Sequence, residues 1–137
     1  MDINQEELRI LIVDDEVNLS KGMERIFRKN FKFKEIVLAH NGKDAWKELM
    51  ESDFDLIMSD WNMPQQNGYD LLCKVRDHEK TKDIPFLMMT GTSDKESIIS
   101  AKEAGVSGYV VKPFNTKTII DKIIQTLSNY NKSTLSL

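Results

Sequence analysis

The chain has 137 residues, about the length of one compact domain, and a formal net charge of -3. Hydrophobic residues make up 40% of it and charged residues 30%, which is ordinary for a globular protein and excludes intrinsic disorder. The acidic balance gives no support to nucleic-acid binding, and no apolar run is long enough to cross a membrane.

The N-terminal residues lack the apolar core of a signal peptide, and the single Cys73 excludes an internal disulfide. A cytoplasmic protein with no membrane partner is therefore expected. We predict one domain over residues 1–137, with an ordered core at about 7–129 and a polar tail at 130–137.

Strand-like apolar runs alternate with helix-like faces along the chain. The predicted strands are 8–13, 31–39, 54–60, 84–89 and 106–111. Apolar residues three or four apart predict helices at 17–30, 45–52, 69–75, 98–104 and 119–127. Strict alternation with short connections predicts right-handed crossovers and a parallel sheet covered on both faces. The fold class is therefore α/β: a doubly wound (βα)5 fold with a five-stranded sheet in the flavodoxin-like order 2-1-3-4-5.

A few residues outside the apolar pattern also carry expectations. Gly68 closes a polar loop and is able to adopt a positive φ, and Gly105 is expected to end the fourth helix. Trp46 is assigned to packing. His40 and His78 are assigned no function, because the sequence indicates no partner for either.

Polar and charged residues follow four of the predicted strands. They are Asp14, Asp15 and Glu16 after the first strand, Asp60 after the third, Thr90 after the fourth and Lys112 after the fifth. Because the carboxyl ends of parallel strands meet at one sheet edge, these side chains are expected to lie together. Carboxylates about 5 Å apart repel by roughly 3 kcal/mol per pair at an effective dielectric of about 20, which indicates a bound cation. Oxygen ligands without His or Cys favour Mg²⁺.

Each of these residues also has an ordinary structural explanation. Asp60 can begin a turn, Thr90 can simply end a strand, and Lys112 can be a surface lysine. The acids after the first strand can instead be favoured by a helix dipole, although three acids are more than that role needs. A metal-bound acidic site with a lysine and a hydroxyl favours phosphoryl transfer, with a free carboxylate as the nucleophile.

The chain resembles the receiver domains of two-component response regulators, and among them the CheY-like chemotaxis regulators. The matching residues are Val13-Asp14-Asp15, Ser59-Asp60-Trp61-Asn62-Met63-Pro64, Gly68, Met89-Thr90 and Gly108-Tyr109-Val110-Val111-Lys112-Pro113-Phe114. The resemblance implies that Asp60 accepts a phosphoryl group from a CheA-like histidine kinase. It implies Mg²⁺ ligation by Asp15, by Asp60, by the backbone carbonyl of Asn62 and, through water, by Asp14.

The same resemblance implies a switch. Thr90 closes on the phosphoryl group, Lys112 pairs with it, and the Tyr109 ring turns inward. Asn62 and Thr92 flank the phosphoryl group and are expected to set its lifetime. The Lys112-Pro113 bond is expected to be cis. The partner-binding surface is expected to comprise Lys95, Ile98, Lys102, Tyr109 and Lys122.

The resemblance implies a monomeric, stand-alone response regulator in chemotaxis signalling rather than a turnover enzyme. No effector domain is expected after residue 129, so the output is a protein partner, the flagellar motor switch protein, with a phosphatase as a further partner. Two alternatives stay open: a phosphorelay intermediate that passes the group to a histidine phosphotransfer protein, and a phosphorylation-independent interaction module. A flavin binder is disfavoured because Asp14-Asp15-Glu16 would repel the flavin phosphate. An aspartyl phosphatase is disfavoured because the first strand lacks an Asp-x-Asp pair.

Overall fold

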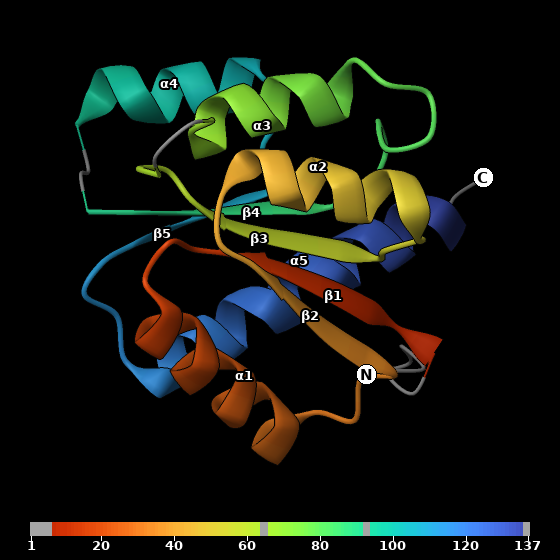
Figure 1. Ribbon diagram of the computed structural model, residues 1–137, viewed down its shortest axis with the longest axis vertical. Coiled ribbons are helices and arrows are strands. Elements are labelled where there is room, and N and C mark those ends of the chain that lie inside the picture. Colours follow the sequence, from red (N-terminus) through yellow and green to blue (C-terminus); the bar gives the residue numbers. More distant parts are fainter. Residues whose placement is uncertain (1–6, 64–65, 92–93, 136–137) are drawn as a thin grey trace.

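The computed structural model describes residues 7–63, 66–91 and 94–135, with side chains up to Asn129 (Figure 1). Within these residues one parallel sheet contains five strands: β1 Arg9–Val13, β2 Glu35–Ala39, β3 Leu56–Asp60, β4 Phe86–Thr90 and β5 Gly108–Val111. The helices are α1 Val17–Asn30, α2 Gly42–Glu51, α3 Gly68–Arg76, α4 Lys95–Glu103 and α5 Thr116–Leu135. The strand order is β2-β1-β3-β4-β5, so the predicted fold class is confirmed.

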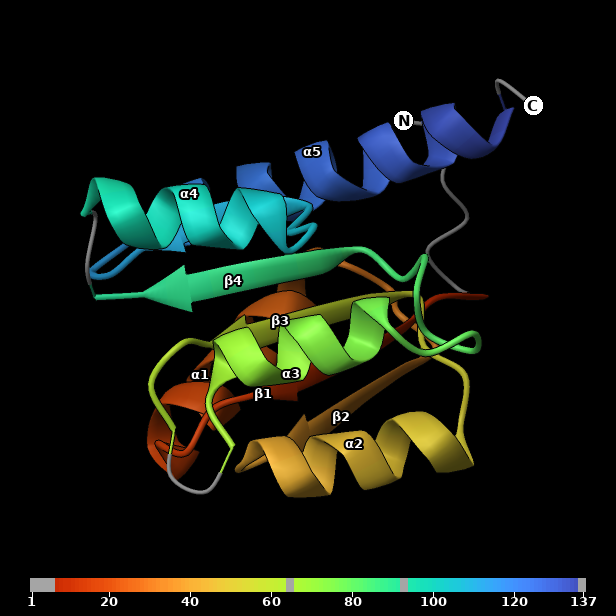
Figure 2. The same ribbon diagram turned by 90° about the horizontal axis from the view of Figure 1, so that it is seen from above.

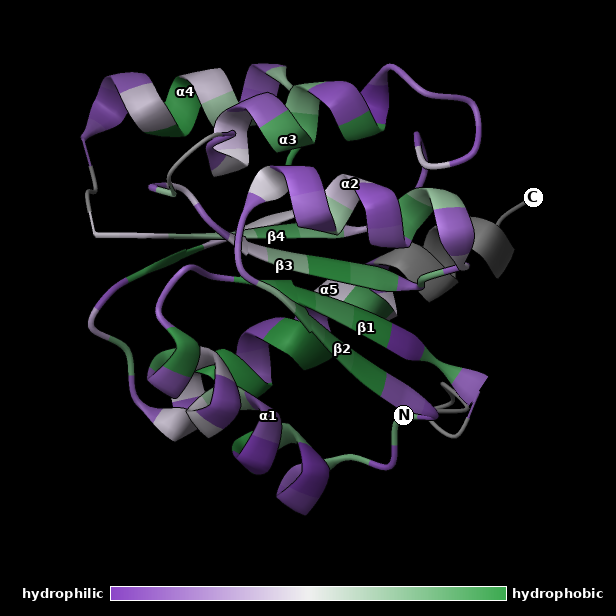
Figure 3. Cartoon of the chain, in the orientation of Figure 1, coloured by the Kyte–Doolittle hydropathy of each residue, from purple (hydrophilic) through white to green (hydrophobic). Residues whose placement is uncertain are grey.

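Helices cover both faces of the sheet. Figures 1 and 2 show α1 and α5 on one face and α2, α3 and α4 on the other. On the α1/α5 face, Ile12 and Met58 of the strands pack with Phe27 of α1. On the opposite face, Leu11 and Ile57 belong to a second buried cluster. Neighbouring strand residues thus face opposite ways, and both faces are covered, which is why the strands are apolar along most of their length, with hydrophilic residues at their ends (Figure 3).

Four of the helices begin at a residue whose side chain accepts a hydrogen bond from a backbone N–H of the first turn. These N-caps are Asn41 for α2, Asn67 for α3, Asp94 for α4 and Asn115 for α5, with acceptor distances of 2.7, 2.8, 2.8 and 2.8 Å. Each cap satisfies a backbone donor that has no partner within the helix. All four caps lie in loops that follow strands, so they fix where these helices leave the edge at which the strands end.

The predicted and observed element boundaries differ most at two places. The segment from Phe31 was predicted as strand, but the Phe31 N–H donates to the Phe27 carbonyl at 2.8 Å and ends α1. The Phe31 ring stacks on Phe33 at a centroid distance of 4.9 Å, so the apolar alternation reflects core packing in a loop before β2. At the other end, α5 continues to Leu135 instead of ending near residue 129. Residues 128–135 contain no Gly or Pro that would end a helix.

The roles of the two glycines differ from each other. Gly105 has φ +94° and follows α4 closely, as predicted. Gly105 is the one described glycine with a positive φ, so Gly68 does not use the conformation that was open to it. A Cβ at Gly68 would collide with the carbonyl oxygen of Asp60. Glycine is therefore needed there because the start of α3 approaches the end of β3 closely.

No helix in the described ranges combines the length and the apolar character that crossing a bilayer requires.

Candidate functional site

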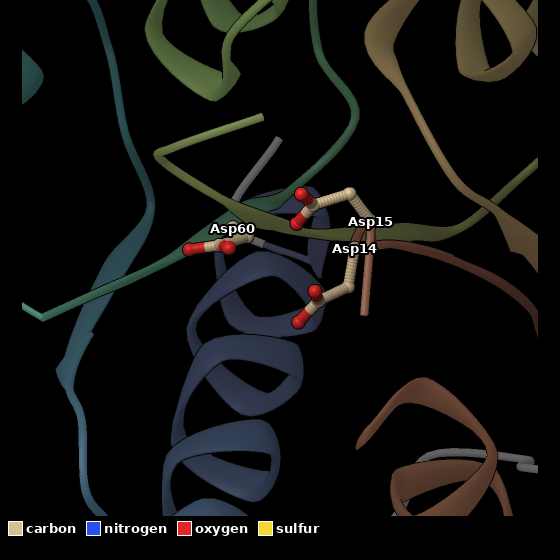
Figure 4. Close-up of side chains that lie close together, drawn as sticks. All are labelled: Asp14, Asp15 and Asp60. Carbon is tan, nitrogen blue, oxygen red and sulfur yellow. The ribbon is translucent and has the colours of Figure 1, made fainter. Parts of the chain in front are cut away.

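Three carboxylates meet at the carboxyl edge of the sheet. Asp14 and Asp15 come from the loop after β1, and Asp60 is the last residue of β3 (Figure 4). The sheet register pairs Val13 with Ser59, which places Asp14 beside Asp60. One carboxylate oxygen from each residue lies within 4.8 Å of the others. Asp14 and Asp60 are buried and Asp15 is exposed, so the cluster opens to solvent on the Asp15 side.

Backbone contacts fix Asp14 in the loop. Its N–H donates to the Ala39 carbonyl at 3.0 Å, and its Oδ1 accepts from the Glu16 N–H at 2.9 Å. Nδ1 of His40 lies 3.1 Å from the Asp14 carbonyl oxygen, within hydrogen-bonding distance. His40 therefore has a partner at this edge, which the sequence interpretation missed. Its position directly after β2 was the available indication.

Lys112 brings a positive charge to the two buried acids. Its Nζ lies 3.4 Å from Oδ2 of Asp60 and 3.5 Å from Oδ2 of Asp14. The Lys112 N–H donates to the Thr90 carbonyl at 2.7 Å, which holds the start of the β5–α5 loop against the end of β4. The Lys112-Pro113 peptide bond is cis, as predicted.

The environment of Asp60 disfavours its ionised form. Burial raises the pKa of the Asp60 carboxyl above its ordinary value, and the nearby Asp14 carboxylate raises it further. The Lys112 ammonium and the Asn62 backbone N–H act in the opposite direction but do not cancel the rise. A further cation at this place would favour the carboxylate form that a nucleophile requires.

Thr90 and Tyr109 lie on the neighbouring strands β4 and β5, and their side chains are in contact. Thr90 is fully buried at the end of β4, and Tyr109 is half-buried on β5. Burial raises the pKa of the Tyr109 hydroxyl, and a side-chain hydrogen bond with Thr90 partly offsets that rise. The Tyr109 ring also packs against the buried cluster on the α2–α4 face. The structure thus connects a buried hydroxyl at the end of β4 to an aromatic ring that is partly exposed on β5.

The structure brings together four of the five residues predicted to bind a partner. Ile98, Lys102, Tyr109 and Lys122 line one hollow of about 200 Å³. Lys95 instead lines a neighbouring hollow with Trp61 and Ser100. Of the two residues predicted to set the phosphoryl lifetime, Asn62 is exposed beside Asp60, and Thr92 lies outside the described residues.

The donor set fits a hard divalent cation. Three carboxylates converge, two of them are buried, and one ammonium group is not enough to balance them. The ligand atoms that Asp14, Asp15 and Asp60 offer are oxygens, which Mg²⁺ prefers. Because Asp15 faces solvent, coordination positions remain for water and for the oxygens of a phosphoryl group.

Comparison with known proteins identifies the class of protein. Residues 10–124 match the response regulator receiver domain, and the chain belongs to this family. It is 39% identical over 128 residues to the chemotaxis protein CheY-3 of Vibrio cholerae, covering 91% of this chain and 98% of that protein. Identity to the chemotaxis protein CheY of Pseudomonas aeruginosa is 38% over 124 residues, covering 90% and 99%.

Solved structures agree with this assignment. The fold is similar to that of the chemotaxis response regulator CheY4 of Vibrio cholerae, with a TM-score of 0.82 and 29% identity over 88% of this chain and 99% of that one. The chain is thus a receiver domain of the CheY-like response regulators, and this membership supports a phosphoacceptor role in chemotaxis-type signalling. Receiver domains generally bind Mg²⁺ at acidic residues, in agreement with the cluster of three aspartates.

Proposed function

We propose that the protein is a response regulator in which Asp60 accepts a phosphoryl group from a CheA-like histidine kinase. The observation that carries the proposal is the position of Asp60, whose carboxylate lies beside those of Asp14 and Asp15 and 3.4 Å from Nζ of Lys112. As the Asp60 oxygen forms its bond to phosphorus, the bond between phosphorus and the donor histidine nitrogen breaks. Asp60 ends a central strand of the sheet, so its backbone is held rigidly.

The residues around Asp60 have separate roles. The carboxylates of Asp15 and Asp60 and the Asn62 carbonyl would hold Mg²⁺, with Asp14 acting through water. Bound Mg²⁺ supplies positive charge that neutralises the phosphoryl oxygens. Lys112 supplies a second positive charge, and its contact with Asp60 keeps the ammonium group near the position that a phosphoryl group would take. The Thr90 hydroxyl donates to a phosphoryl oxygen.

The hydrogen bond between Thr90 and Tyr109 supports a switch. A phosphoryl oxygen competes for the Thr90 hydroxyl, and this changes which position of the Tyr109 ring is favoured. Tyr109 lines the same hollow as Ile98, Lys102 and Lys122. Phosphorylation therefore changes the partner surface of α4, β5 and α5, which also includes Lys95 on α4.

The partner that reads this surface is proposed to be a flagellar motor switch protein, and the signalling system chemotaxis. Support comes from the two chemotaxis proteins that share 38–39% identity with nearly the whole chain. We place this activity in the cytoplasm, with a phosphatase as a further partner. The protein acts as a monomer and turns over no small substrate.

Two measurements test the proposal. Transfer of labelled phosphate from an autophosphorylated CheA-type kinase is expected for the wild type and for Asp53→Asn, whose side chain is 95% exposed, but not for Asp60→Asn. Affinity for a purified flagellar motor switch protein is expected to rise with Mg²⁺ and beryllofluoride. Equal affinity with and without beryllofluoride contradicts the switch. Onward transfer to a histidine phosphotransfer protein without any gain in motor-switch affinity favours a phosphorelay role.

A further inference from the structure

The two ends of α4 are attached to the molecule very differently. Within Lys95–Glu103, Ala101 is the buried residue, and Ile99 is 43% exposed. The residues of the first turn, 94–96, are exposed, and the Asp94 side chain caps its own helix by accepting from the Ser97 N–H. At the other end, Ala104 and Val106 pack against the buried cluster on the α2–α4 face.

The guanidinium of Arg76, the last residue of α3, fastens this second end. Its Nε donates to the Gly105 carbonyl at 2.9 Å, and its Nη2 donates to the Ser107 hydroxyl at 3.3 Å. Its Nη1 donates to the carbonyls of Lys82 and Ile84 at 3.0 and 2.6 Å. One side chain therefore joins the end of α3, the α3–β4 loop and the α4–β5 turn.

Several features show that this turn is built around Arg76. The Ser107 hydroxyl, which accepts from Arg76, also accepts from the Phe86 N–H at 2.9 Å, so the turn is held against the start of β4 as well. A Cβ at Gly105 would lie 3.1 Å from Nε of Arg76, and the φ of +94° also favours glycine. Burial partly desolvates the positive charge of the guanidinium and thereby lowers its pKa. The hydrogen bonds of this buried group therefore contribute more to stability than those of an exposed arginine.

We propose that Arg76 is a positioning residue that fixes the C-terminal end of α4, so that α4 moves by pivoting about Gly105. The pivoting of α4 rests on the proposed function. The attachment of its C-terminal end by Arg76 does not. Motion begins at the other end because α4 follows β4, whose last residue is Thr90 at the acidic site. A helix held at its C-terminal end cannot shift as a whole, so its N-terminal end changes position most.

The pivot determines which part of the partner surface changes. Ser107 and Gly108 line the hollow on the fixed side, and Ile98 lines it from the part of α4 that can move. A rotation about Gly105 therefore moves Ile98 relative to Tyr109 while Gly108 stays in place. The hollow changes shape without any displacement of β5 within the sheet.

Hydrogen exchange of individual amides, measured by NMR in the absence of a phosphodonor, tests the fixing. In Arg76→Gln the amides of Gly105 and Val106 are expected to exchange about tenfold faster than in the wild type, with Ser97 unchanged. Arg76→Lys keeps the charge but not the forked geometry, and a smaller acceleration is expected. The control Arg28→Gln removes an exposed arginine paired with Glu24 and should change none of the three amides. Equal rates at Gly105 and Val106 in the wild type and Arg76→Gln overturn the proposal.

The amides of Ser97, Ile98 and Val106 are then compared with and without Mg²⁺ and beryllofluoride. In the wild type the change is expected at Ser97 and Ile98 and not at Val106, and in Arg76→Gln it is expected to extend to Val106. A wild-type change as large at Val106 as at Ser97 overturns the pivot. If no amide of the wild type responds, both the proposed function and the pivot are contradicted. Whether Arg76 fixes the C-terminal end of α4 is decided separately, by the comparison of Arg76→Gln with the wild type.

Discussion

The ammonium nitrogen of Lys112 lies 3.4 Å from a carboxylate oxygen of Asp60, and the lysine side chain is 21% exposed. The contact joins the ends of two strands that are not neighbours, since β4 lies between β3 and β5 in the sheet. It holds a cation beside the proposed acceptor before any phosphoryl group arrives. Lys112 is therefore pre-organised for charge that develops during transfer.

Replacement of Lys112 by glutamine should slow phosphorylation of Asp60. The variant loses the protein's own positive charge at the site, and the expected decrease in rate with acetyl phosphate and Mg²⁺ is roughly a hundredfold. Mass spectrometry of the intact protein measures the phosphorylated fraction over time. Lys117→Gln changes an exposed lysine on α5 and serves as the control. Similar rates for Lys112→Gln and Lys117→Gln would show that the contact with Asp60 does not assist transfer.

Replacement of Asp60 by asparagine should stabilise the metal-free protein at neutral pH. Burial, with Asp14 adding to it, raises the pKa of Asp60 above 3.8, so the folded protein holds this proton more readily than the unfolded chain. The stability that this raised pKa contributes is present at pH values below the ordinary pKa of 3.8. It is lost as the pH rises through the raised pKa of the folded protein. Asparagine carries no charge at either pH, so it avoids the loss.

Urea unfolding in EDTA checks this expectation. The midpoint of Asp60→Asn is expected to exceed that of the wild type at neutral pH, and the difference should shrink as the pH falls towards 3.8. Asp53→Asn, at a side chain that is 95% exposed, should leave the midpoint unchanged. A lower midpoint for Asp60→Asn at neutral pH would mean that the attraction of Lys112 outweighs the burial of the carboxylate.

Alanine at two glycines should have opposite effects on stability. A Cβ at Gly68 collides with the Asp60 carbonyl, which is backbone and cannot rotate away, so Gly68→Ala is expected to cost about 3 kcal/mol. Gly22 lies within α1 with nothing within 4 Å of its Cβ position, and Gly22→Ala is expected to stabilise the fold by roughly 0.5–1 kcal/mol. Urea denaturation gives both values, and a neutral Gly68→Ala would contradict the close approach.

The two tryptophans should respond differently to metal. Trp61 follows Asp60 directly, its ring stacks on Tyr69 at 5.4 Å, and its backbone N–H donates to the Met89 carbonyl at 2.7 Å. Trp46 lies on α2, where Nζ of Lys74 is 4.6 Å from its ring centroid. Mg²⁺ is therefore expected to change the fluorescence of Trp46→Phe and not that of Trp61→Phe, and EDTA should reverse the change. A persistent response in Trp61→Phe would place the metal elsewhere.

The sequence predicted the sheet and its functional edge well, because both depend on local patterns. Buried parallel strands are apolar throughout, and charged residues that end them, such as Asp60 and Lys112, must lie at a common edge. The segment at Phe31 and Phe33 failed because two core residues separated by one position look the same in a strand and in a packed loop.

Other features could not be predicted because they depend on groups that lie elsewhere in the sequence. His40 reaches a carbonyl in another loop, and all four acceptors of Arg76 lie in segments that follow it in the chain. No periodicity in the sequence distinguishes such an arginine from one that faces solvent. In the sequence, Gly68 was singled out for the positive φ that glycine allows. The structure shows a different reason for glycine there, because a Cβ would collide with the carbonyl oxygen of Asp60.

The sparse burial of α4 has an evolutionary consequence. Ala101 is the buried residue of α4, and Ile99 is 43% exposed. Most substitutions on this helix are therefore expected to cost little folding free energy. The acceptor, the lysine and the acids belong to other elements and are unaffected by such substitutions. Duplicated copies of a chain built this way can diverge in the targets they recognise while they retain one and the same phosphorylation chemistry.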